Sequence, residues 1–344
     1  MKTSNFFAPL LVAVSMTASV TADFTVTPGR TKAVVFPENN ANFAKEWTLE
    51  AGRNTDTVDS LHLDLAGRVH VRYTDTLPED VLGYVNVTGS AKAVVDAVKV
   101  GNSLINVIDG DDDSDSDDEN VDNKFDLRNI FDRNDNLFIR LGNRKVSGYL
   151  LTEVVLAHDT VWDVKSAHSA QVVIEDGVLV TDSKKKLRIE ATDSSAIFVS
   201  AAETAVSVRQ LILSASGTAK IEYKVGSVAV QSGTYIETQD SATISVLSPS
   251  LTTHKLALEA ESPDSICISA EEIEAKRRKI DGRNKISMPN SANKHGTTGI
   301  FQCQESALPP RQPLSVTGNA AATTAENGAL SLDGDLSDPE ANLD

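Results

Sequence analysis

The chain has 344 residues and a formal net charge of −17, with only 5% aromatic residues. A negative charge of this size repels nucleic-acid phosphates and anionic membrane surfaces, and few aromatic side chains are present to stack on bases. These quantities argue against nucleic acid as a partner and against adsorption to anionic lipid.

Residues 1–22 have the pattern of a secretory signal peptide. Lys2 supplies the positive start, residues 6–14 are largely apolar, and residues 20–22 are small enough for a cleavage site. The apolar stretch is shorter than the ~20 residues that cross a bilayer, so we expect cleavage and no membrane span. We therefore expect the mature protein to be secreted and extracellular, with a cell surface or wall as an alternative location.

The segment from residue 23 to about 106 is rich in valine and threonine. Residues 61–65 and 69–73 alternate apolar and polar side chains, which predicts strands. Residues 90–95, Ser-Ala-Lys-Ala-Val-Val, look like a first copy of a phrase that recurs later. The sequon at Asn86 makes this residue a candidate for glycosylation in a eukaryotic host.

Residues 109–136 interrupt this pattern with an acidic, asparagine-rich insertion. Nine acidic residues and no basic ones lie between 109 and 122, which predicts a disordered loop. Weak binding of divalent cations is the alternative, although Ser116 stands where a helix–loop–helix calcium loop needs glycine. The 79 residues from Ala91 to Ala170, less the 28 of the insertion, leave 51, which fits two further coils of one solenoid.

From Leu137 to about Ile268 a short phrase recurs about every 23 residues. Its alanines at 170, 196, 219 and 242 are 26, 23 and 23 residues apart, a spacing typical of a solenoid. Because side chains alternate along a strand, two further columns are expected to point inward with the alanines. These are Val172, Phe198, Ile221 and Ile244, then Ile174, Ser200, Tyr223 and Val246. The expected second strands are 187–189, 211–213, 228–230 and 256–258.

The sequence therefore predicts an all-β chain whose residues 23–270 form a right-handed parallel β-helix. The alternative is a β-sandwich, which also has short strands at regular intervals. Residues 271–283 are expected to form a capping helix, with Lys276–Lys279 as its basic end or as a processing site. Residues 284–344 have the composition of a disordered tail. Cys267 and Cys303 are candidates for one disulfide, or are two separate thiols.

Residues with catalytic chemistry do not gather in any motif of the sequence. Asp193 and Asp240 fall at similar points of their coils and are interpreted as turn residues. The six histidines form no pair at metal-ligand spacing; they are His62, His70, His158, His168, His254 and His295. We therefore predict no catalytic, cofactor-binding or metal-binding residues, and no cofactor.

Residues 215–221, Ala-Ser-Gly-Thr-Ala-Lys-Ile, and their copies resemble the GIN-type head domain of auto-transporter adhesins, found mostly in bacterial envelope proteins. The resemblance covers about residues 30–270, with fewer turn glycines than the family has and with the added acidic insertion. It implies a right-handed β-helix and an adhesive role at a surface, and it supplies no catalytic residues. The leading hypothesis is a non-enzymatic protein that binds an extracellular glycan or protein, or has a structural role. The alternative is a polysaccharide lyase or glycoside hydrolase. The sequence does not indicate the oligomeric state.

Overall fold

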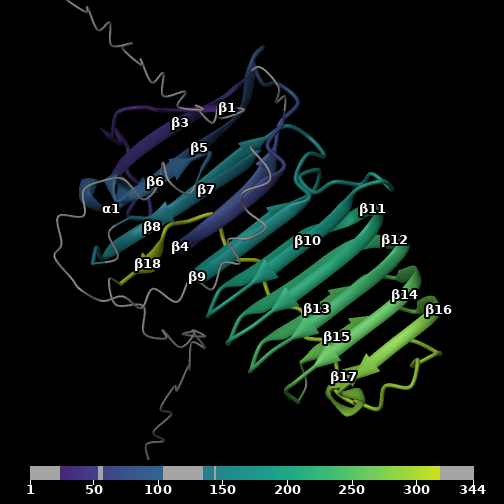
Figure 1. Cartoon of the computed structure of the whole chain (residues 1–344). Coiled ribbons are helices and arrows are strands. Elements are labelled where there is room, and N and C mark those ends of the chain that lie inside the picture. The colour runs from purple at the N-terminus through teal and green to yellow at the C-terminus, as the bar shows by residue number, and fades with distance from the viewer. Residues whose placement is uncertain (1–23, 53–56, 104–134, 143–144, 264, 318–344) are drawn as a thin grey trace, which may run out of the picture.

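The computed structural model describes residues 24–52, 57–103, 135–142, 145–263 and 265–317. Within them the chain is nearly all β and forms a solenoid of about five turns, with an N-terminal cap at one end (Figure 1). The predicted β-solenoid is confirmed, and the β-sandwich alternative is not the fold. The predicted signal peptide and residues 109–134 of the predicted disordered insertion lie outside the described residues, whereas Asn136, at the predicted end of the insertion, begins a strand.

The elements follow in chain order. The cap contains β1 (Phe24–Pro28), β2 (Lys32–Ala33), β3 (Phe43–Ala51), β4 (Ser60–Tyr73), β5 (Val81–Gly89), α1 (Lys92–Asp96), β6 (Val98–Gly101), β7 (Asn136–Leu141) and β8 (Gly148–Leu156). The coils contain β9 (Asp163–Glu175), β10 (Lys186–Ala191), β11 (Ala196–Ala215), β12 (Lys220–Thr238), β13 (Thr243–Leu247), β14 (Ser250–Ala260), β15 (Ile266–Ser269), β16 (Glu272–Asp281) and β17 (Ile286–Ser287). A 3-10 turn (Arg283–Lys285) precedes β17, and β18 (Leu314–Val316) returns to the cap.

Each regular coil has three parallel faces. In the coil of β11, residues 196–201 lie in face 1, 205–208 in face 2 and 210–215 in face 3, and each segment pairs with the matching segment of β12. The register shifts twice along this pair, between faces 1 and 2 and between faces 2 and 3. These irregularities are the corners at which the long strands bend from one face to the next.

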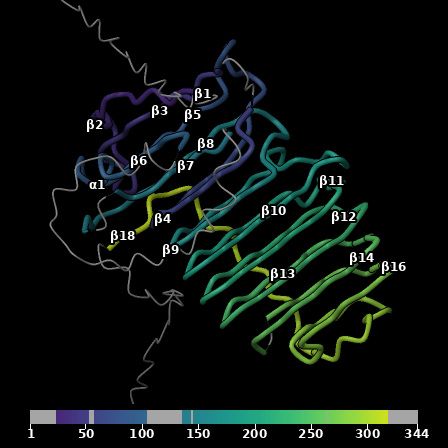
Figure 2. The backbone as a smooth tube through the Cα atoms, viewed as in Figure 1, coloured from purple at the N-terminus to yellow at the C-terminus, as the bar shows by residue number. Residues whose placement is uncertain are grey.

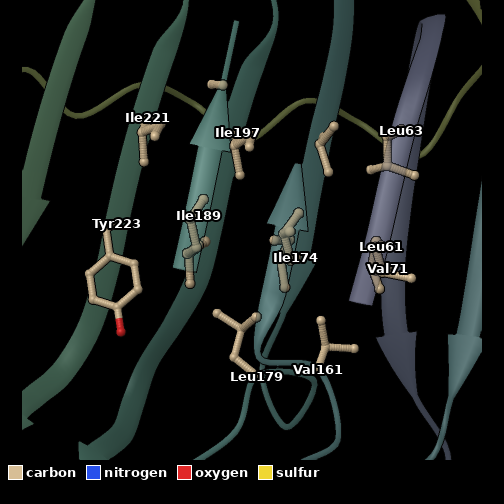
Figure 3. Close-up of a cluster of buried hydrophobic side chains, with 14 of the residues drawn as sticks. Leu61, Leu63, Val71, Val161, Ile174, Leu179, Ile189, Ile197, Ile221 and Tyr223 are labelled. Atoms are coloured by element: carbon tan, nitrogen blue, oxygen red, sulfur yellow. The ribbon is translucent and has the colours of Figure 1, made fainter. Parts of the chain in front are cut away.

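Faces 1 and 3 each place stacked aliphatic side chains in the interior. Val172, Ile197, Ile221, Ile244, Ile266 and Ile286 succeed one another in face 1, and Ile174, Val199, Tyr223, Val246 and Ile268 form the column beside them. Figure 3 shows Ile197, Ile221 and Tyr223 on neighbouring strands, pointing into the same core. Full burial of an isoleucine contributes ~1.5–3 kcal/mol, so these columns are the main source of stability.

The predicted columns are off by one residue in the second copy of the phrase. Ala196 pairs with Gln171 and Lys220, so Ser195 occupies the position of the alanines 170, 219 and 242. Ser195 is fully buried, and its hydroxyl donates to the carbonyl oxygens of Ser166 and Thr192 at 3.0 and 2.9 Å. Because a slip of one residue exchanges the faces of a strand, Phe198 and Ser200 point outward, contrary to the prediction.

The coils also shorten along the chain. Successive positions from Val172 to Ile286 in face 1 are 25, 24, 23, 22 and 20 residues apart. The repeat is therefore not a constant 23 residues. The expected second strands hold except at 228–230, which belongs to face 2, while Thr234, Tyr235 and Ile236 pair with residues 211–213.

The N-terminal region is a cap in which only part of the strand pairing is parallel, so it does not consist of the regular coils that were predicted. The pairs β1–β3, β3–β5 and β5–β8 are antiparallel. In contrast, β4 runs parallel to β7, β8 and β9. Residues 90–95, the expected early copy of the phrase, include the short helix α1 with Val94 and Val95 buried. Antiparallel strands at this end close the first coil, which would otherwise expose a parallel edge.

The region after residue 270 differs from the prediction in two respects. Residues 272–281 form the edge strand β16, paired parallel with β14, in place of a capping helix. Residues 284–317 are ordered instead of forming part of a disordered tail: β17 joins the coil stack and β18 pairs antiparallel with β8. Residues 318–344 of the expected tail lie outside the described residues. No helix in the described part of the chain is long and apolar enough to span a bilayer.

Candidate binding face

Face 1 is covered on its outer side by residues 299–316, which we call the strap. Figure 2 shows this segment running back from the last coil to β18 beside the cap. A disulfide joins Cys303 to Cys267 of β15, with 5.3 Å between the Cα atoms. Further along, the Ser306 amide donates to both carboxylate oxygens of Glu222, at 3.1 and 3.2 Å.

The strap buries the whole outward column of face 1. Each of its side chains is at most 8% exposed: His70, Val173, Phe198, Glu222, Ser245, Cys267 and Ser287. Desolvation lowers the pKa of His70, against an opposing contribution from Glu175. Lys220 lies 3.2 Å from Glu222 and offsets part of the cost of burying that carboxylate. Face 1 is therefore closed to a ligand while the strap is in place.

Face 3 carries three ordered columns of outward side chains. The central column is Arg188, Ile212, Tyr235, Ala257 and Lys279. Beside it runs an acidic column of Glu190, Ser214, Glu237, Glu259 and Asp281. On the other side lie Lys186, Gln210, Gly233, Lys255 and Arg277. Because the coils are stacked in register, the side chains of one column recur at ~4.8 Å along the solenoid axis.

Tyr235 lies at the centre of face 3 and has an ordered ring. A Cβ added to Gly233 would lie 2.9 Å from this ring, so the ring lies across the glycine on the sheet surface. The Lys255 ammonium is 4.9 Å from the ring centroid, within the range of a cation–π interaction. The result is a partly exposed aromatic platform with Glu237 on the same side of its strand.

Face 2 has an outward column that holds no aromatic side chain. Its members are Ser207, Ala229, Thr252 and Glu274, one on each successive coil. Three of these four side chains are small, so this column offers no ring as an anchor. Of the two faces that the strap leaves open, face 3 is the better candidate for ligand binding.

Next to β4, face 3 contains a buried group of charges. The Asp163 carboxylate accepts from Arg188 Nε at 2.8 Å and also pairs with Nη2. Lys165 is 4% exposed and lies 3.6 Å from Glu190. Within each pair the cation neutralises the carboxylate, which lowers the cost of burying the charges. Their carboxylates are engaged by cations, so this group closes the end of the face against the cap.

His62 packs beside these pairs and is held neutral. It is 5% exposed and stacks on Phe138 with ring centroids 4.6 Å apart. Burial lowers the pKa of His62 to about 4, opposed by Asp163 and reinforced by Lys165 and Arg188. His62 and His70 are both buried, and both belong to β4.

The structure places one histidine between two carboxylates, which the sequence did not indicate. His168 Nε2 is 3.2 Å from Asp64 Oδ1, and its Nδ1 is 3.4 Å from Asp193 Oδ2. All three side chains are partly exposed at the corner between faces 3 and 1. An imidazole between two carboxylates is chemically suited to proton transfer. Asp64 comes from a cap strand 104 residues before His168, so local spacing gave no signal of this group.

The same corner explains Asp193 and Asp240. His168, Asp193, Gly217 and Asp240 occupy this turn in successive coils, with φ angles of +64, +61, +76 and +56°. Asp193 Oδ2 accepts from the amide of His168, and Asp240 Oδ2 from that of Gly217, both at 3.2 Å. Left-handed turns favour Gly, Asn and Asp. The two aspartates are thus turn residues, and Gly217 is the intervening one.

A cleft of about 200 Å³ opens near the junction of the cap and the first coil. Its lining includes Tyr73, His158, Asp159, Asp176 and Thr181. The Asp159 carboxylate is already occupied by the Thr181 amide at 2.6 Å and hydroxyl at 3.0 Å. His158 packs edge-on against Tyr73, with centroids 4.8 Å apart. The cleft is small, and its polar groups are largely engaged with one another.

The remaining predicted residues are placed as follows. Asn86 lies partly exposed in the middle of β5, between Glu46 of β3 and Glu153 of β8. His254 is exposed, whereas His295 is 5% exposed and its Nε2 lies 2.9 Å from the carbonyl oxygen of Ile273. Within the described ranges, no three His, Cys, Asp or Glu side chains gather as metal ligands.

Comparisons of the chain with protein-family models, with curated proteins and with solved structures find no match. The arrangement of the side chains is therefore the basis for assigning a function.

Proposed function

We propose that this chain is a secreted, non-enzymatic β-solenoid that binds an extended glycan along face 3, at a cell surface, wall or matrix. The observation that carries the proposal is the aromatic platform of Tyr235 between a column of carboxylates and a column with cations. Apolar ring faces pack against the C–H faces of sugars, and flanking charged groups hydrogen-bond to hydroxyls. The regular coil spacing suits a ligand that itself repeats.

Face 3 carries charges of both signs in separate columns, and the chain as a whole is negative. Glu190, Glu237, Glu259 and Asp281 align on one side, Lys186, Lys255 and Arg277 lie on the other, and the whole chain has a charge of −17. The acidic column and the negative net charge disfavour a uronate or sulfated polymer. A neutral glycan, or one with amino groups, is the expected ligand.

Affinity electrophoresis of the folded chain in gels with a soluble polysaccharide tests the proposal. The panel is xylan, partly deacetylated chitin and polygalacturonate, of which only the first two should retard the protein. Tyr235→Ala should weaken retardation by about tenfold or more, because a central aromatic anchor contributes ~1.4 kcal/mol or more. Tyr149→Ala is the matched control, since Tyr149 is 40% exposed on β8, away from face 3. Equal loss in both variants, or no dependence on Tyr235, contradicts the proposal.

A polysaccharide-cleaving enzyme is the second candidate, and His168 between Asp64 and Asp193 is the observation that favours it. The chain is incubated with the same three polymers, with and without Ca²⁺, and new reducing ends are measured. The binding proposal predicts no turnover. Turnover that disappears in His168→Asn while the fold is retained would establish the enzyme instead.

A further inference from the structure

The solenoid ends on a strand whose outer edge is open. β16 pairs with β14 along one side, from Glu272↔Ser250 to Asp281↔Glu259. On the other side, His295 reaches the carbonyl oxygen of Ile273, and no described strand or loop hydrogen-bonds to the backbone of residues 275–281. An exposed row of backbone donors and acceptors is a template for another extended chain.

Positive charge is concentrated on this edge. Lys276, Arg277, Arg278 and Lys279 are consecutive and all exposed. Residues 272–285 hold six basic and three acidic side chains, a local excess of positive charge in a chain of net charge −17. Within the described residues only Lys279 of the four forms an ion pair, with Glu259 at 3.9 Å.

The cations of β16 lie on both faces of the strand, the inward and the outward one. Arg278 follows Leu256 in an inward column, yet it is exposed because no further coil covers it. Arg277 follows Lys255 on the outward side. A chain that pairs with this edge would therefore meet cations on both of its faces.

This arrangement selects the kind of chain that can dock. Two β16 edges repel one another, and so does any basic or neutral strand that leaves the cations without counter-charges. An acidic segment supplies carboxylates to the guanidinium groups, which bind them in a bidentate manner, and its backbone satisfies both donors and acceptors of the edge. A polysaccharide has no such alternating backbone.

We propose that β16 docks an extended acidic peptide segment, and that its occupant is residues 109–122 of a second copy of this chain. Those fourteen residues carry nine acidic side chains and no basic one. The two partners are encoded in one chain and are always present at equal concentration. At physiological salt, charges more than ~8 Å apart are largely screened, so the local attraction is felt while the repulsion between whole chains is weak.

Complementary variants of the full chain test whether the contact joins two copies. The first variant has Arg277→Gln and Arg278→Gln and keeps the acidic segment. The second keeps β16 and replaces the nine acidic residues between 109 and 122 by their amides. In sedimentation velocity each variant alone should be monomeric, an equimolar mixture should form a 1:1 complex, and added salt should dissociate it. Lys184→Gln with Lys185→Gln removes the same charge at a partly exposed turn and should leave self-association unchanged.

A labelled peptide with the sequence of residues 109–122 gives a direct readout. It should bind the amide-substituted chain, and Arg277→Gln with Arg278→Gln in that chain should weaken binding by about fivefold or more. Circular dichroism of each variant shows whether the fold is kept. The proposal is overturned if the mixture stays monomeric, if the lysine control weakens association equally, or if heparin binds through β16 while the peptide does not. Association independent of β16 also overturns it. Arg277 also ends one column of face 3, so glycan binding is judged separately, from Tyr235→Ala.

Discussion

Replacement of Tyr223 by phenylalanine is predicted to stabilise the protein. Tyr223 stands in the inner column between Val199 and Val246 and is fully buried. Its hydroxyl has no hydrogen-bond partner among the described residues. Burial raises the pKa of Tyr223 above its ordinary value, as expected for a phenol far from water. Figure 3 shows the ring pointing into the core from its strand.

The size of the effect follows from the hydroxyl alone. An unsatisfied buried hydroxyl costs ~1–3 kcal/mol, and Tyr223→Phe removes it while keeping the ring. The free energy of unfolding should therefore rise by ~1–3 kcal/mol, measured by urea denaturation with far-UV circular dichroism. Tyr235→Phe, on the outer surface, should change it by less than ~0.5 kcal/mol.

Alkaline pH provides a second test of the same reasoning. Since the folded pKa of Tyr223 is raised, its contribution is complete below the unfolded value of ~10 and is lost as pH rises above it. Tyr223→Phe should lack this part of the alkaline destabilisation. A variant that is less stable than the parent would refute the argument, because it would mean that the hydroxyl has a partner, such as a buried water.

Two further predictions concern the buried His62 and the disulfide that holds the strap. The folded pKa of His62, about 4, lies below the unfolded ~6.5, so its stabilising contribution is present above pH 6.5 and declines by ~3 kcal/mol as pH falls to 4. His62→Gln should remove this component from the pH dependence of unfolding and His158→Gln should not; equal pH profiles for parent and His62→Gln would contradict it. The Cys267–Cys303 disulfide closes a sequence separation of 36 residues, for which chain entropy gives ~3–4 kcal/mol. Cys303→Ser should lower the thermal midpoint as much as reduction of the parent does, and no change in either would show that the strap is held without the bond.

The sequence predicted the solenoid because three of the four alanines do occupy one inner position. It failed at the copy with Ser195, where a hydroxyl that bonds to two carbonyl oxygens takes the place of the methyl group. Aligning the copies by their alanines places Ala196 in that position, although the true residue is its neighbour Ser195. This shift of one residue exchanges the inward and outward faces of the strand. Burial of the side chains of the whole coil decides the register, and a six-residue phrase contains only part of those side chains.

The errors after residue 270 have a different cause. Residues 272–279 have good helix formers, but the free edge of β14 pairs with nine residues of β16, and this tertiary pairing overrides the local preference. Residues 299–316 lack enough apolar groups to fold alone. They are ordered because face 1 and Cys267 hold them, a dependence on distant residues that composition does not show.

The candidate sites could not be predicted from local sequence either. To place Tyr235 on face 3, the strand at 234–236 has to be distinguished from the one at 228–230. His168 meets Asp64 only because β4 and β9 run side by side. Such pairings depend on the order of strands in space, and one sequence with an internal repeat predicts that order only within the repeat.

The strap changes how the solenoid should come apart. In an open stack each coil touches only its neighbours, so the terminal coil can peel away first and the others can follow one by one. Here the segment that leaves the last coil returns to β8 of the cap, and its path crosses every coil of face 1. Loss of the last coil therefore requires the strap to detach from coils that are still intact. The two ends of the stack are linked, and the array should unfold as one cooperative unit.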